Sequence, residues 1–448
     1  MSLPRTSPDV SAGRLTAADY AKNFADAHPP LSAVQALLEA ERCYYCFDAP
    51  CMHACPTGID IPSFIARIAQ GNLRGAARTI LEENILGGMC ARVCPTEVLC
   101  EQACVRNTQE DKPVEIGALQ RHATDDHFAA PGAPLFTRAA PSGKRIAVVG
   151  AGPAGLACAH RLALLGHAVL LFDAGPRLGG LNEYGLAAYK TVGGFAQQEI
   201  DWLLSVGGIE VKSNHCLGRD VQLEALVREH DAVFLGLGLA GVNALGLGAE
   251  AEAASRAAVD FIAELRQATS PAVVPVGRRV LVIGGGMTAV DAAVQSRLLG
   301  AEEVSIVYRR GPEAMPASGR EQQWAQHHGV TIRHWAAPQQ LLLDGGRVRG
   351  MRFARTRLEG DRLVETGESF ELAADVVLRA IGQSFVPEPT AGAVALQDGR
   401  IATDAQGQTS HPKIWAGGDC RHGGRDLTVE AVEDGKLAAI AIDRTLRA

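Results

Sequence analysis

The sequence of 448 residues predicts a doubly wound α/β protein that follows a helical, cysteine-rich N-terminal domain. Three observations predict this class. From residue 145 onward, short apolar runs alternate with alanine-rich segments, as buried strands and helices do around parallel sheets. Two of these runs end in glycine-rich turns, at residues 150 and 284. Eight of the 11 cysteines lie between Cys43 and Cys104.

Before residue 130 the apolar residues recur with helical spacing. They do so in LSAVQALLEAER, IPSFIARIAQGNLRGAARTILEEN and VEIGALQRHATDDHF. These stretches predict amphipathic helices around a cysteine centre. Residues 130–144 are rich in proline, glycine and alanine without periodicity, which predicts a linker. Residues 1–20 lack a basic and apolar leader and form a polar lead-in.

Charge and hydropathy exclude some classes of partner. A net charge of -7 argues against nucleic acid or anionic lipid as a partner bound by charge. The most apolar stretch, residues 145–172, is punctuated by glycine and proline, which fits a strand, turn and helix better than a membrane span. We therefore expect a cytoplasmic protein. In that reducing compartment a cysteine cluster favours metal over disulfides.

The first glycine-rich turn follows the strand predicted at residues 145–149. Gly150, Gly152 and Gly155 have the G-x-G-x-x-G spacing, which permits a tight turn and a close approach to a pyrophosphate at a helix N-terminus. Asp173 ends the next strand, where an acid can bind a ribose hydroxyl. The other residues expected at this dinucleotide site are Ala154, Gly180, Leu181 and Gly236.

The second turn repeats the arrangement with Gly284, Gly286 and Ala289. The strand after it ends in Arg309 and Arg310 instead of an acid. Arginine at this position can accommodate a 2′-phosphate, so the pattern favours NADPH over NADH. The alternative is that both arginines are ordinary surface charges.

A third strand exit lies near the C-terminus, in KIWAGGD. Gly418 and Asp419 follow the strand, and a helix begins near Thr428. Such an aspartate can bind a sugar or ribityl hydroxyl, and a helix N-terminus can stabilise negative charge on a reduced ring. Gly382, in AIGQ, marks another strand exit that we expect at the same edge.

The elements at 150, 284 and 417 together resemble the flavoproteins that have two dinucleotide-binding domains. The resemblance implies FAD in the first site and NAD(P)H in the second, with hydride passing between them. It predicts a helical domain with linker at 1–140, an FAD-binding domain at 141–242 and 377–448, and an inserted NAD(P)H-binding domain at 243–376. Many relatives reduce a C-x-x-C disulfide, but no such pair follows residue 104, so the electrons need another exit. No catalytic acid or base is required.

The cysteines form two motifs, C-x2-C-x4-C-x3-C-P from Cys43 to Cys55 and a second group from Cys90 to Cys104. Thiolates are the ligands of iron–sulfur clusters, and runs that end in Cys-Pro are typical of ferredoxins with two clusters. Zinc and disulfides are the alternatives. A chain with two dinucleotide sites favours electron-carrying clusters.

ERCYYCFDAPCMHACPTGIDIPSFI and GGMCARVCPTEVLCEQACVR resemble the N-terminal domain shared by bacterial glutamate synthase small subunits and dihydropyrimidine dehydrogenase. The resemblance implies two [4Fe-4S] clusters with interleaved ligands. One cluster would be held by Cys43, Cys46, Cys51 and Cys104. The other would be held by Cys55, Cys94, Cys100 and Gln120. Cys90 is left over as a buried thiol.

Other stretches bear on the choice between these relatives. TVEAVEDGK and GGLNEYGLAAYK resemble dihydropyrimidine dehydrogenases, whereas YRRGPEAMPAS also resembles glutamate synthase. We expect the flavin and iron–sulfur subunit of a bacterial NAD(P)-dependent dihydropyrimidine dehydrogenase. Its partner would be an FMN-binding barrel subunit with iron–sulfur clusters, in a heterotetramer that interconverts uracil or thymine and their 5,6-dihydro forms. The alternatives are the small subunit of NADPH-dependent glutamate synthase and a zinc-binding redox-sensing or scaffold protein.

Overall fold

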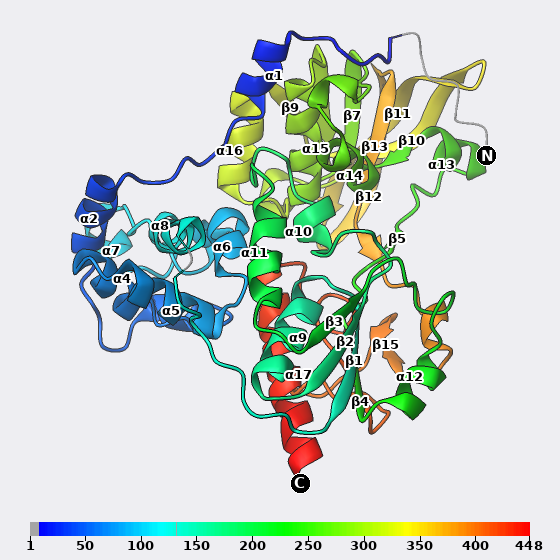
Figure 1. The fold of residues 1–448 in the computed structure, drawn as a ribbon. Helices are drawn as coiled ribbons and strands as arrows, with labels where there is room; N and C mark the ends of the chain where they lie inside the picture. Colours follow the sequence, from blue (N-terminus) through cyan, green and yellow to red (C-terminus); the bar gives the residue numbers. More distant parts are fainter. Residues whose placement is uncertain (1–8, 131) are drawn as a thin grey trace. The chain divides into compact units, whose positions relative to one another are not determined.

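A computed structural model describes residues 9–130 and 132–448 (Figure 1). The chain forms two compact units. Unit 1 consists of Met1–Ala27, Tyr184–Val192 and Gly241–Ser384, and unit 2 consists of His28–Glu183, Gly193–Ala240 and Phe385–Ala448. The first eight residues of the predicted lead-in, and Pro131 of the predicted linker, lie outside the described residues.

The N-terminal part of unit 2 is helical. Its helices are α2 (Ala33–Glu41), α3 (Pro50–His53), α4 (Ile61–Ala69), α5 (Leu73–Glu83), α6 (Gly87–Val93), α7 (Asn107–Glu110) and α8 (Ile116–Ala129), with a short 3-10 turn η1 (Thr96–Val98). Phe64, Ile80 and Leu119 belong to its core, and five of the cysteines pack against that core. The predicted helices around a cysteine centre are confirmed.

Local sequence sets the ends of these helices. The stretch 61–84 holds two helices because Gly71 adopts a φ of +72° between them, a conformation that favours glycine. The side chain of Asn72 then accepts a hydrogen bond from the N–H of Gly75 and caps α5. Asp60 caps α4 in the same way through Ser63.

The rest of unit 2 surrounds a parallel five-stranded sheet in the order β17-β4-β1-β2-β3. Its elements are β1 (Arg145–Val149), α9 (Pro153–Leu164), β2 (Ala168–Phe172), α11 (Phe195–Leu204), β3 (Ile209–Lys212), α12 (Leu223–Glu229), β4 (Ala232–Leu235), β17 (Ile414–Ala416) and α17 (Thr428–Arg447). Val149 of β1 pairs with Phe172 on one side and Leu235 on the other. Strand order reverses between β1 and β4, where α/β sheets bind ligands.

Unit 1 contains a second parallel sheet, in the order β6-β13-β7-β8-β9, and an antiparallel sheet, β10-β11-β12. Their strands are β6 (Arg256–Ala257), β7 (Arg279–Gly284), β8 (Glu303–Val307), β9 (Val330–Arg333), β10 (Ala336–Asp344), β11 (Arg347–Glu359), β12 (Arg362–Ala373) and β13 (Val376–Ala380). The helices are α1 (Ala17–Asn23), α13 (Ala249–Ala254), α14 (Ala258–Gln267), α15 (Met287–Leu298) and α16 (Gly319–His327). Tyr20 of α1 lies in the core of this unit.

The predicted fold class is confirmed, with a helical domain followed by an α/β region that contains two parallel sheets. The short apolar runs expected as strands after residue 145 correspond to β1, β2, β4, β7, β8, β13 and β17. Short strands β5 (Gly241–Val242) and β14 (Gln383–Ser384) pair antiparallel in unit 1. Helix α10 (Leu181–Tyr184) lies at a boundary between the units. Within the described residues, no helix combines the length and apolarity needed to cross a bilayer.

Candidate functional site

The first glycine turn is packed so tightly that only glycine fits at two of its positions. A Cβ on Gly150, whose φ is +94°, would lie 2.1 Å from the carbonyl oxygen of Gly236, and one on Gly155 would lie 1.8 Å from that of Gly150. Gly152 differs, since the nearest atom to its Cβ would be 3.9 Å away. Packing does not demand glycine at 152, so its open side is the cradle that a pyrophosphate can fill.

Other predicted residues of unit 2 meet this turn. A Cβ on Gly180 would lie 2.8 Å from Gly152 Cα, and one on Gly418 would lie 3.3 Å from Ala154 Cβ. Thr428 is the first residue of α17, and its Oγ1 donates a hydrogen bond to Asn182 Oδ1 at 2.7 Å. Asn182 directly follows Leu181 in the sequence. The structure thus brings the glycine turn, the 180–182 loop and the start of α17 together at the carboxyl edge of one sheet.

Two acidic residues lie at the same edge. Asp173 follows β2, and its carboxylate accepts hydrogen bonds from Ala151 N at 2.7 Å and Gly175 N at 2.8 Å. Burial raises the pKa of Asp173, although these two bonds lower it. Asp419 follows β17, and burial together with the neighbouring Asp426 raises its pKa to about 6. Asp173 is therefore held by the backbone of the glycine turn, with lone pairs left for a hydroxyl.

The second glycine turn lies in unit 1 after β7. Gly284 has a φ of +145°, and a Cβ there would lie 2.1 Å from the carbonyl oxygen of Ala380. Nothing lies within 4 Å of a Cβ built on Gly286, and Ala289 is fully buried in α15. This unit therefore offers a second open cradle. Gly382 follows β13 in the same unit, with a φ of +94° beside Asn243. The expectation that it lies at the same edge as Gly418 and Asp419 is wrong, because β13 belongs to the sheet of unit 1 and β17 to the sheet of unit 2.

Arg309 and Arg310 follow β8, the strand next to β7. Both residues are exposed. Their backbone carbonyls accept hydrogen bonds from Thr356 Oγ1 and Trp335 N, respectively. Because the backbone is held while the guanidinium groups face solvent, the side chains are available to an anionic group at the carboxyl edge of the sheet.

The cysteines of the helical domain gather in two neighbourhoods. Cys43, Cys46, Cys51 and Cys104 line one small cavity. Cys94 lies within hydrogen-bonding distance of Cys90 and next to Cys100 and Cys55. The first group contains the four cysteines predicted for one cluster. The second contains the three cysteines predicted for the other cluster, together with Cys90, which is 2% exposed. Ligation itself stays a prediction.

Gln120 lies on α8, the helix that packs against α6. Its side chain is buried, and its Nε2 donates to the carbonyl oxygen of Gly87 at 2.7 Å. The amide oxygen, the atom that could bind iron, takes no part in this bond. Gln120 is thereby fixed to the first residue of the helix that leads to Cys94.

The thiol environment fits a polynuclear cluster. Burial, together with the nearby Cys104 and Cys43, raises the pKa of Cys51 to about 12. Such thiols become thiolates only beside strong positive charge, which iron supplies. Among the described residues, no three His, Cys, Asp or Glu side chains converge closely enough to hold a single metal ion.

Comparison with known families agrees with this geometry. Residues 20–131 match the family described as dihydropyrimidine dehydrogenase domain II, 4Fe-4S cluster. Residues 144–435, more than half of the chain, match the pyridine nucleotide-disulphide oxidoreductases. The chain belongs to the pyridine nucleotide-disulphide oxidoreductase family. It is an NAD(P)H-dependent oxidoreductase of the branch that carries FAD and a 4Fe-4S domain.

Curated relatives of this oxidoreductase match along nearly the whole chain. The glutamate synthase [NADPH] small chain of Escherichia coli K12 is 35% identical over 94% of this chain and 93% of its own. The NAD-dependent dihydropyrimidine dehydrogenase subunit PreT of the same strain is 34% identical over 93% of this chain and 96% of its own. Both families named from the sequence are thus confirmed as relatives, and both relatives are subunits of larger enzymes.

Solved structures share the fold of this oxidoreductase. FprA of Mycobacterium tuberculosis in complex with NADPH matches with a TM-score of 0.57 and 21% identity over 68% of this chain and 84% of its own. Thioredoxin reductase of T. acidophilum matches with a TM-score of 0.52 and 20% identity over 68% of this chain and all of its own. At these identities the likeness concerns the fold alone.

The oxidoreductase also contains buried polar residues that the sequence does not single out. Lys190 lies 2.8 Å from Asp291 and 2.7 Å from Glu321 in unit 1. Glu199 is fully buried in unit 2 and accepts hydrogen bonds from α6. Their partners lie far away along the chain, so no local spacing or motif could have marked them.

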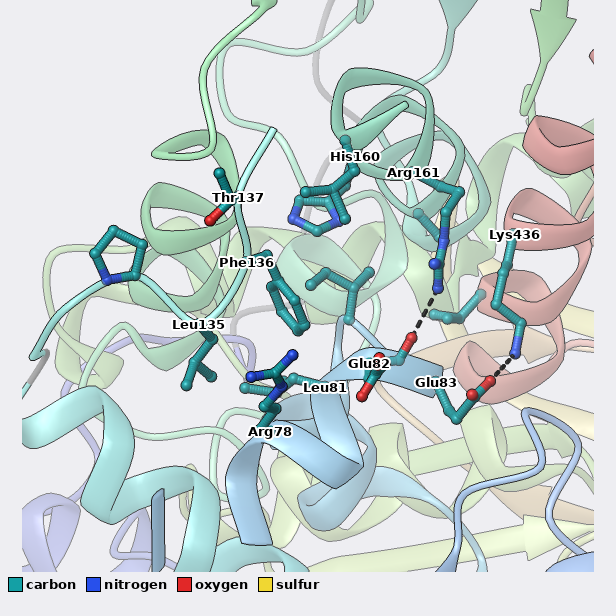
Figure 2. Close-up of a pocket in the computed structure, with 15 residues that line it drawn as sticks. Arg78, Leu81, Glu82, Glu83, Leu135, Phe136, Thr137, His160, Arg161 and Lys436 are labelled. Atoms are coloured by element: carbon teal, nitrogen blue, oxygen red, sulfur yellow. Dashed lines mark hydrogen bonds and ion pairs between the residues drawn. The ribbon is translucent and has the colours of Figure 1, made fainter. Parts of the chain in front are cut away.

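A cavity of about 500 Å³ lies between α5, α9 and α17 in unit 2 (Figure 2). None of the predicted site residues lines it. At its edge Lys436 Nζ donates to Glu83 Oε2 at 2.9 Å, and Arg161 donates to the carbonyl oxygen of Glu82 at 2.7 Å. These bonds attach α5 of the helical domain to two helices that flank the first parallel sheet. The cavity therefore lies at the interface between the cysteine-rich and flavin-binding parts of unit 2.

Proposed function

We propose that this chain is the electron-entry subunit of a dihydropyrimidine dehydrogenase. When bound, FAD accepts hydride from NAD(P)H and passes single electrons through two [4Fe-4S] clusters to an FMN-containing partner subunit, where uracil or thymine and their 5,6-dihydro forms interconvert. The similarity to PreT, which covers nearly the whole of both chains, supports this assignment. The chain's own residues bind and orient these groups, and no side-chain acid or base is needed for the transfer.

The observation that carries the proposal is the placement of Gln120. It is a buried amide, fixed to Gly87 on the helix that leads to Cys94. The second cysteine group supplies Cys55, Cys94 and Cys100, and the resemblance to dihydropyrimidine dehydrogenase gives the fourth ligand as glutamine. A buried glutamine here completes the donor set that the cysteines leave open.

The exit of electrons through the helical domain has further support. All cysteines are free thiols, and Cys158, Cys216 and Cys420 each stand outside any C-x-x-C pair. Cys158 and Cys420 are buried, and burial raises the pKa of both thiols. Neither has the low pKa and exposure of a reactive redox thiol. Because none of the three forms a C-x-x-C pair, we propose the two cysteine groups of the helical domain as the route for electrons.

We assign the remaining residues to the dinucleotides. Gly150, Gly152 and Gly155 would cradle the FAD pyrophosphate, with Asp173 near the ribose and Asp419 near the ribityl chain. Gly284 and Gly286 would cradle the pyrophosphate of NAD(P)H, and the exposed Arg309 and Arg310 would meet a 2′-phosphate.

A second candidate is the small chain of glutamate synthase. The sequence identity is 35% to that protein and 34% to PreT, so identity does not separate the two candidates. Exposed arginines after β8 suit NADPH, the cofactor in its name. Its partner would be a large amidotransferase subunit.

Reconstitution separates the two candidates. The anaerobically purified chain is combined either with an FMN-barrel subunit encoded beside it or with a large amidotransferase subunit. We expect NAD(P)H-dependent uracil reduction with the barrel subunit only, and reduction of ferricyanide but not of uracil by the isolated chain. Glutamate formation with the large subunit would establish the second candidate. Uracil reduction by the isolated chain would refute the proposed division of labour.

A further inference from the structure

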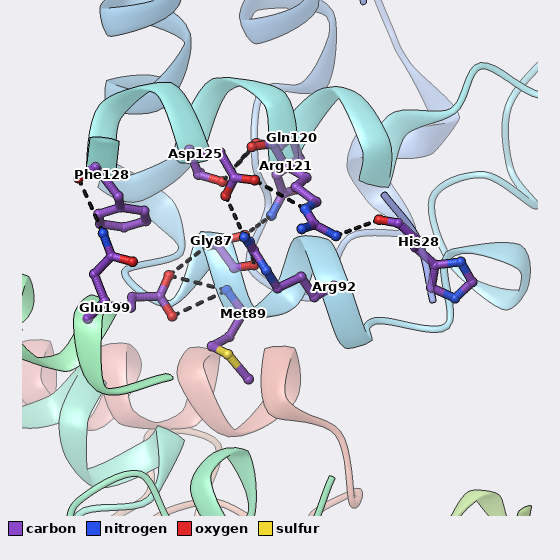
Figure 3. A network of polar contacts seen from close by, with 12 residues as sticks. His28, Gly87, Met89, Arg92, Gln120, Arg121, Asp125, Phe128 and Glu199 are labelled. Carbon is purple, nitrogen blue, oxygen red and sulfur yellow. Dashed lines mark hydrogen bonds and ion pairs between the residues drawn. The ribbon is translucent and has the colours of Figure 1, made fainter. Parts of the chain in front are cut away.

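Glu199 links the flavin-binding part of unit 2 to a turn of the cysteine-rich domain. It lies on α11, and its side chain is fully buried. Oε1 accepts a hydrogen bond from Gly88 N at 2.7 Å, and both carboxylate oxygens lie 3.2 Å from Met89 N (Figure 3). Burial raises the pKa of this carboxyl group to about 8, although the two backbone hydrogen bonds lower it. In either protonation state its oxygens can accept from the two backbone N–H groups, and breaking the contact would leave buried donors unpaired, so the contact fixes the position of that backbone.

Two consecutive glycines at the start of α6 permit this contact. A Cβ on Gly88 would lie 2.5 Å from Phe195 Cζ and 2.8 Å from Glu199 Oε1, and one on Gly87 would lie 2.5 Å from Ile80. A side chain at position 88 would therefore hold α6 away from α11, and one at position 87 would hold it away from Ile80 on α5. The two consecutive glycines allow the backbone of one domain to reach a carboxylate of the other.

The same turn is joined to the second cysteine group. The carbonyl oxygen of Gly87 accepts the bond from Gln120, and α6 ends at Cys94. Glu199 thus holds the N–H groups of residues 88 and 89 while Gln120 holds the carbonyl of residue 87. A shift of this turn moves the two expected ligands Gln120 and Cys94 together.

Arg92 holds the C-terminal end of α6 against the same two helices. Its guanidinium lies 3.4 Å from the centre of the Phe195 ring on α11, and its Nη2 lies 2.6 Å from Asp125 on α8. Asp125 also pairs with Arg121 at 3.1 Å. Helix α6 is therefore held from α11 and from α8 at both of its ends, within a single network (Figure 3).

We propose that Glu199 is a positioning residue for the second [4Fe-4S] cluster. Its carboxylate, supplied by the flavin-binding part of the chain, fixes α6 and so sets where Cys94 and Gln120 present their ligand atoms relative to the flavin-binding sheet. This inference rests on the cluster ligands assigned under the proposed function, and it does not depend on the partner subunit or the final substrate.

The test uses the anaerobically purified holoprotein with Glu199→Ala, Glu199→Gln and Gln198→Ala. Gln198 is the matched control, because it lies on the same helix and its side chain donates to Phe128 O on α8 instead of to the backbone of α6. Iron, sulfide and flavin are quantified, and the EPR spectrum and midpoint potential of each cluster are recorded. Electron transfer from flavin to clusters is followed by stopped flow after mixing with NAD(P)H.

We expect Glu199→Ala to change the EPR signal and potential of one cluster only and to slow the flavin-to-cluster phase about tenfold or more. Gln198→Ala should match the native protein, and Glu199→Gln, which keeps an acceptor oxygen, should lie between. Native signals, potentials and rates in Glu199→Ala would overturn the proposal. If Glu199→Ala loses both clusters, Glu199→Gln decides: recovery of the second cluster supports the positioning role, and loss of both again overturns it. Native protein that lacks clusters altogether would instead refute the cluster assignment.

Discussion

The ammonium group of Lys190 and the carboxylate of Asp291 form a buried ion pair with an N–O distance of 2.8 Å. Burial alone lowers the pKa of Lys190, but Asp291 and Glu321 outweigh it and leave that pKa raised. Asp291 Oδ2 also accepts a bond from Ala187 N at 3.1 Å. Within unit 1, this pair therefore fastens the segment 184–192 to α15.

Breaking that pair should destabilise unit 1. Asp291→Ala leaves a buried ammonium with one carboxylate fewer, so we expect the free energy of unfolding to fall by about 3 kcal/mol. Urea unfolding followed by circular dichroism measures the change. Glu302→Ala removes an exposed pair with Arg278 and should cost less than about 1 kcal/mol. Equal losses in the two variants would contradict a special role for the buried pair.

The arginines after β8 should decide cofactor preference. Arg309→Ala removes a charge-assisted contact to a 2′-phosphate worth about 1.5–3 kcal/mol, so the KM for NADPH should rise roughly ten- to hundredfold. The KM for NADH should stay unchanged, since NADH has no such phosphate. Arg347→Ala, at the exposed start of β11, is the control. An unchanged KM for NADPH in both Arg309→Ala and Arg310→Ala would leave the arginines as surface charges.

The two cysteine groups predict separate losses of iron. The native protein should contain about eight iron atoms per FAD. Cys94→Ser should lower this number to about four, and Cys90→Ser should leave it unchanged, because Cys90 is outside the proposed ligand sets. Iron and acid-labile sulfide are measured after anaerobic purification. If Cys90→Ser lost iron and Cys94→Ser did not, Cys90 would be the cluster ligand in place of Cys94.

The raised pKa of Asp419, about 6, predicts a pH dependence of stability. Between about pH 4 and pH 6 the folded protein keeps a proton that the unfolded chain has released, so this group's contribution to stability falls as pH rises through that window and is constant above it. Asp419→Asn removes the effect. Its stability relative to the native protein should therefore increase from pH 5 to pH 7, by about 1.4 kcal/mol.

Urea midpoints at pH 5, 6 and 7 test this expectation. Asp361→Asn, at an exposed position in unit 1, should follow the native protein at every pH. If the curve for Asp419→Asn runs parallel to the native curve, burial of the carboxylate does not control its protonation.

The sequence predicts seven of the ten described parallel strands, because each of the seven contains a short, continuous apolar run. Strands β3 and β9 alternate apolar and polar residues, and β6 has two residues, so these three are not predicted. The antiparallel sheet escapes that criterion. Strand β11 places buried residues singly or in pairs between exposed ones along its 13 residues, and much of β12 is exposed, so neither contains a continuous apolar run.

The candidate site divides in the same way. Gly150 and Gly284 can be predicted from the sequence because the backbone conformation of each turn requires glycine. Glu199 is separated from Gly88 by 111 residues, and only the packing of α11 on α6 brings them together. Tertiary contacts between polar residues of this kind leave no periodicity in the sequence, so the links between sites are predictable only from the fold.

The interleaving of the cysteine groups has a consequence for synthesis of the protein. Cys51 lies beside Cys104, and Cys100 lies beside Cys55, so neither group is complete until both motifs have left the ribosome. Under the proposed ligand sets, the first cluster can be completed once Cys104 has emerged, whereas the second must wait for Gln120 on α8. The two clusters should therefore be filled one after the other during synthesis, and only after nearly the whole helical domain has been made.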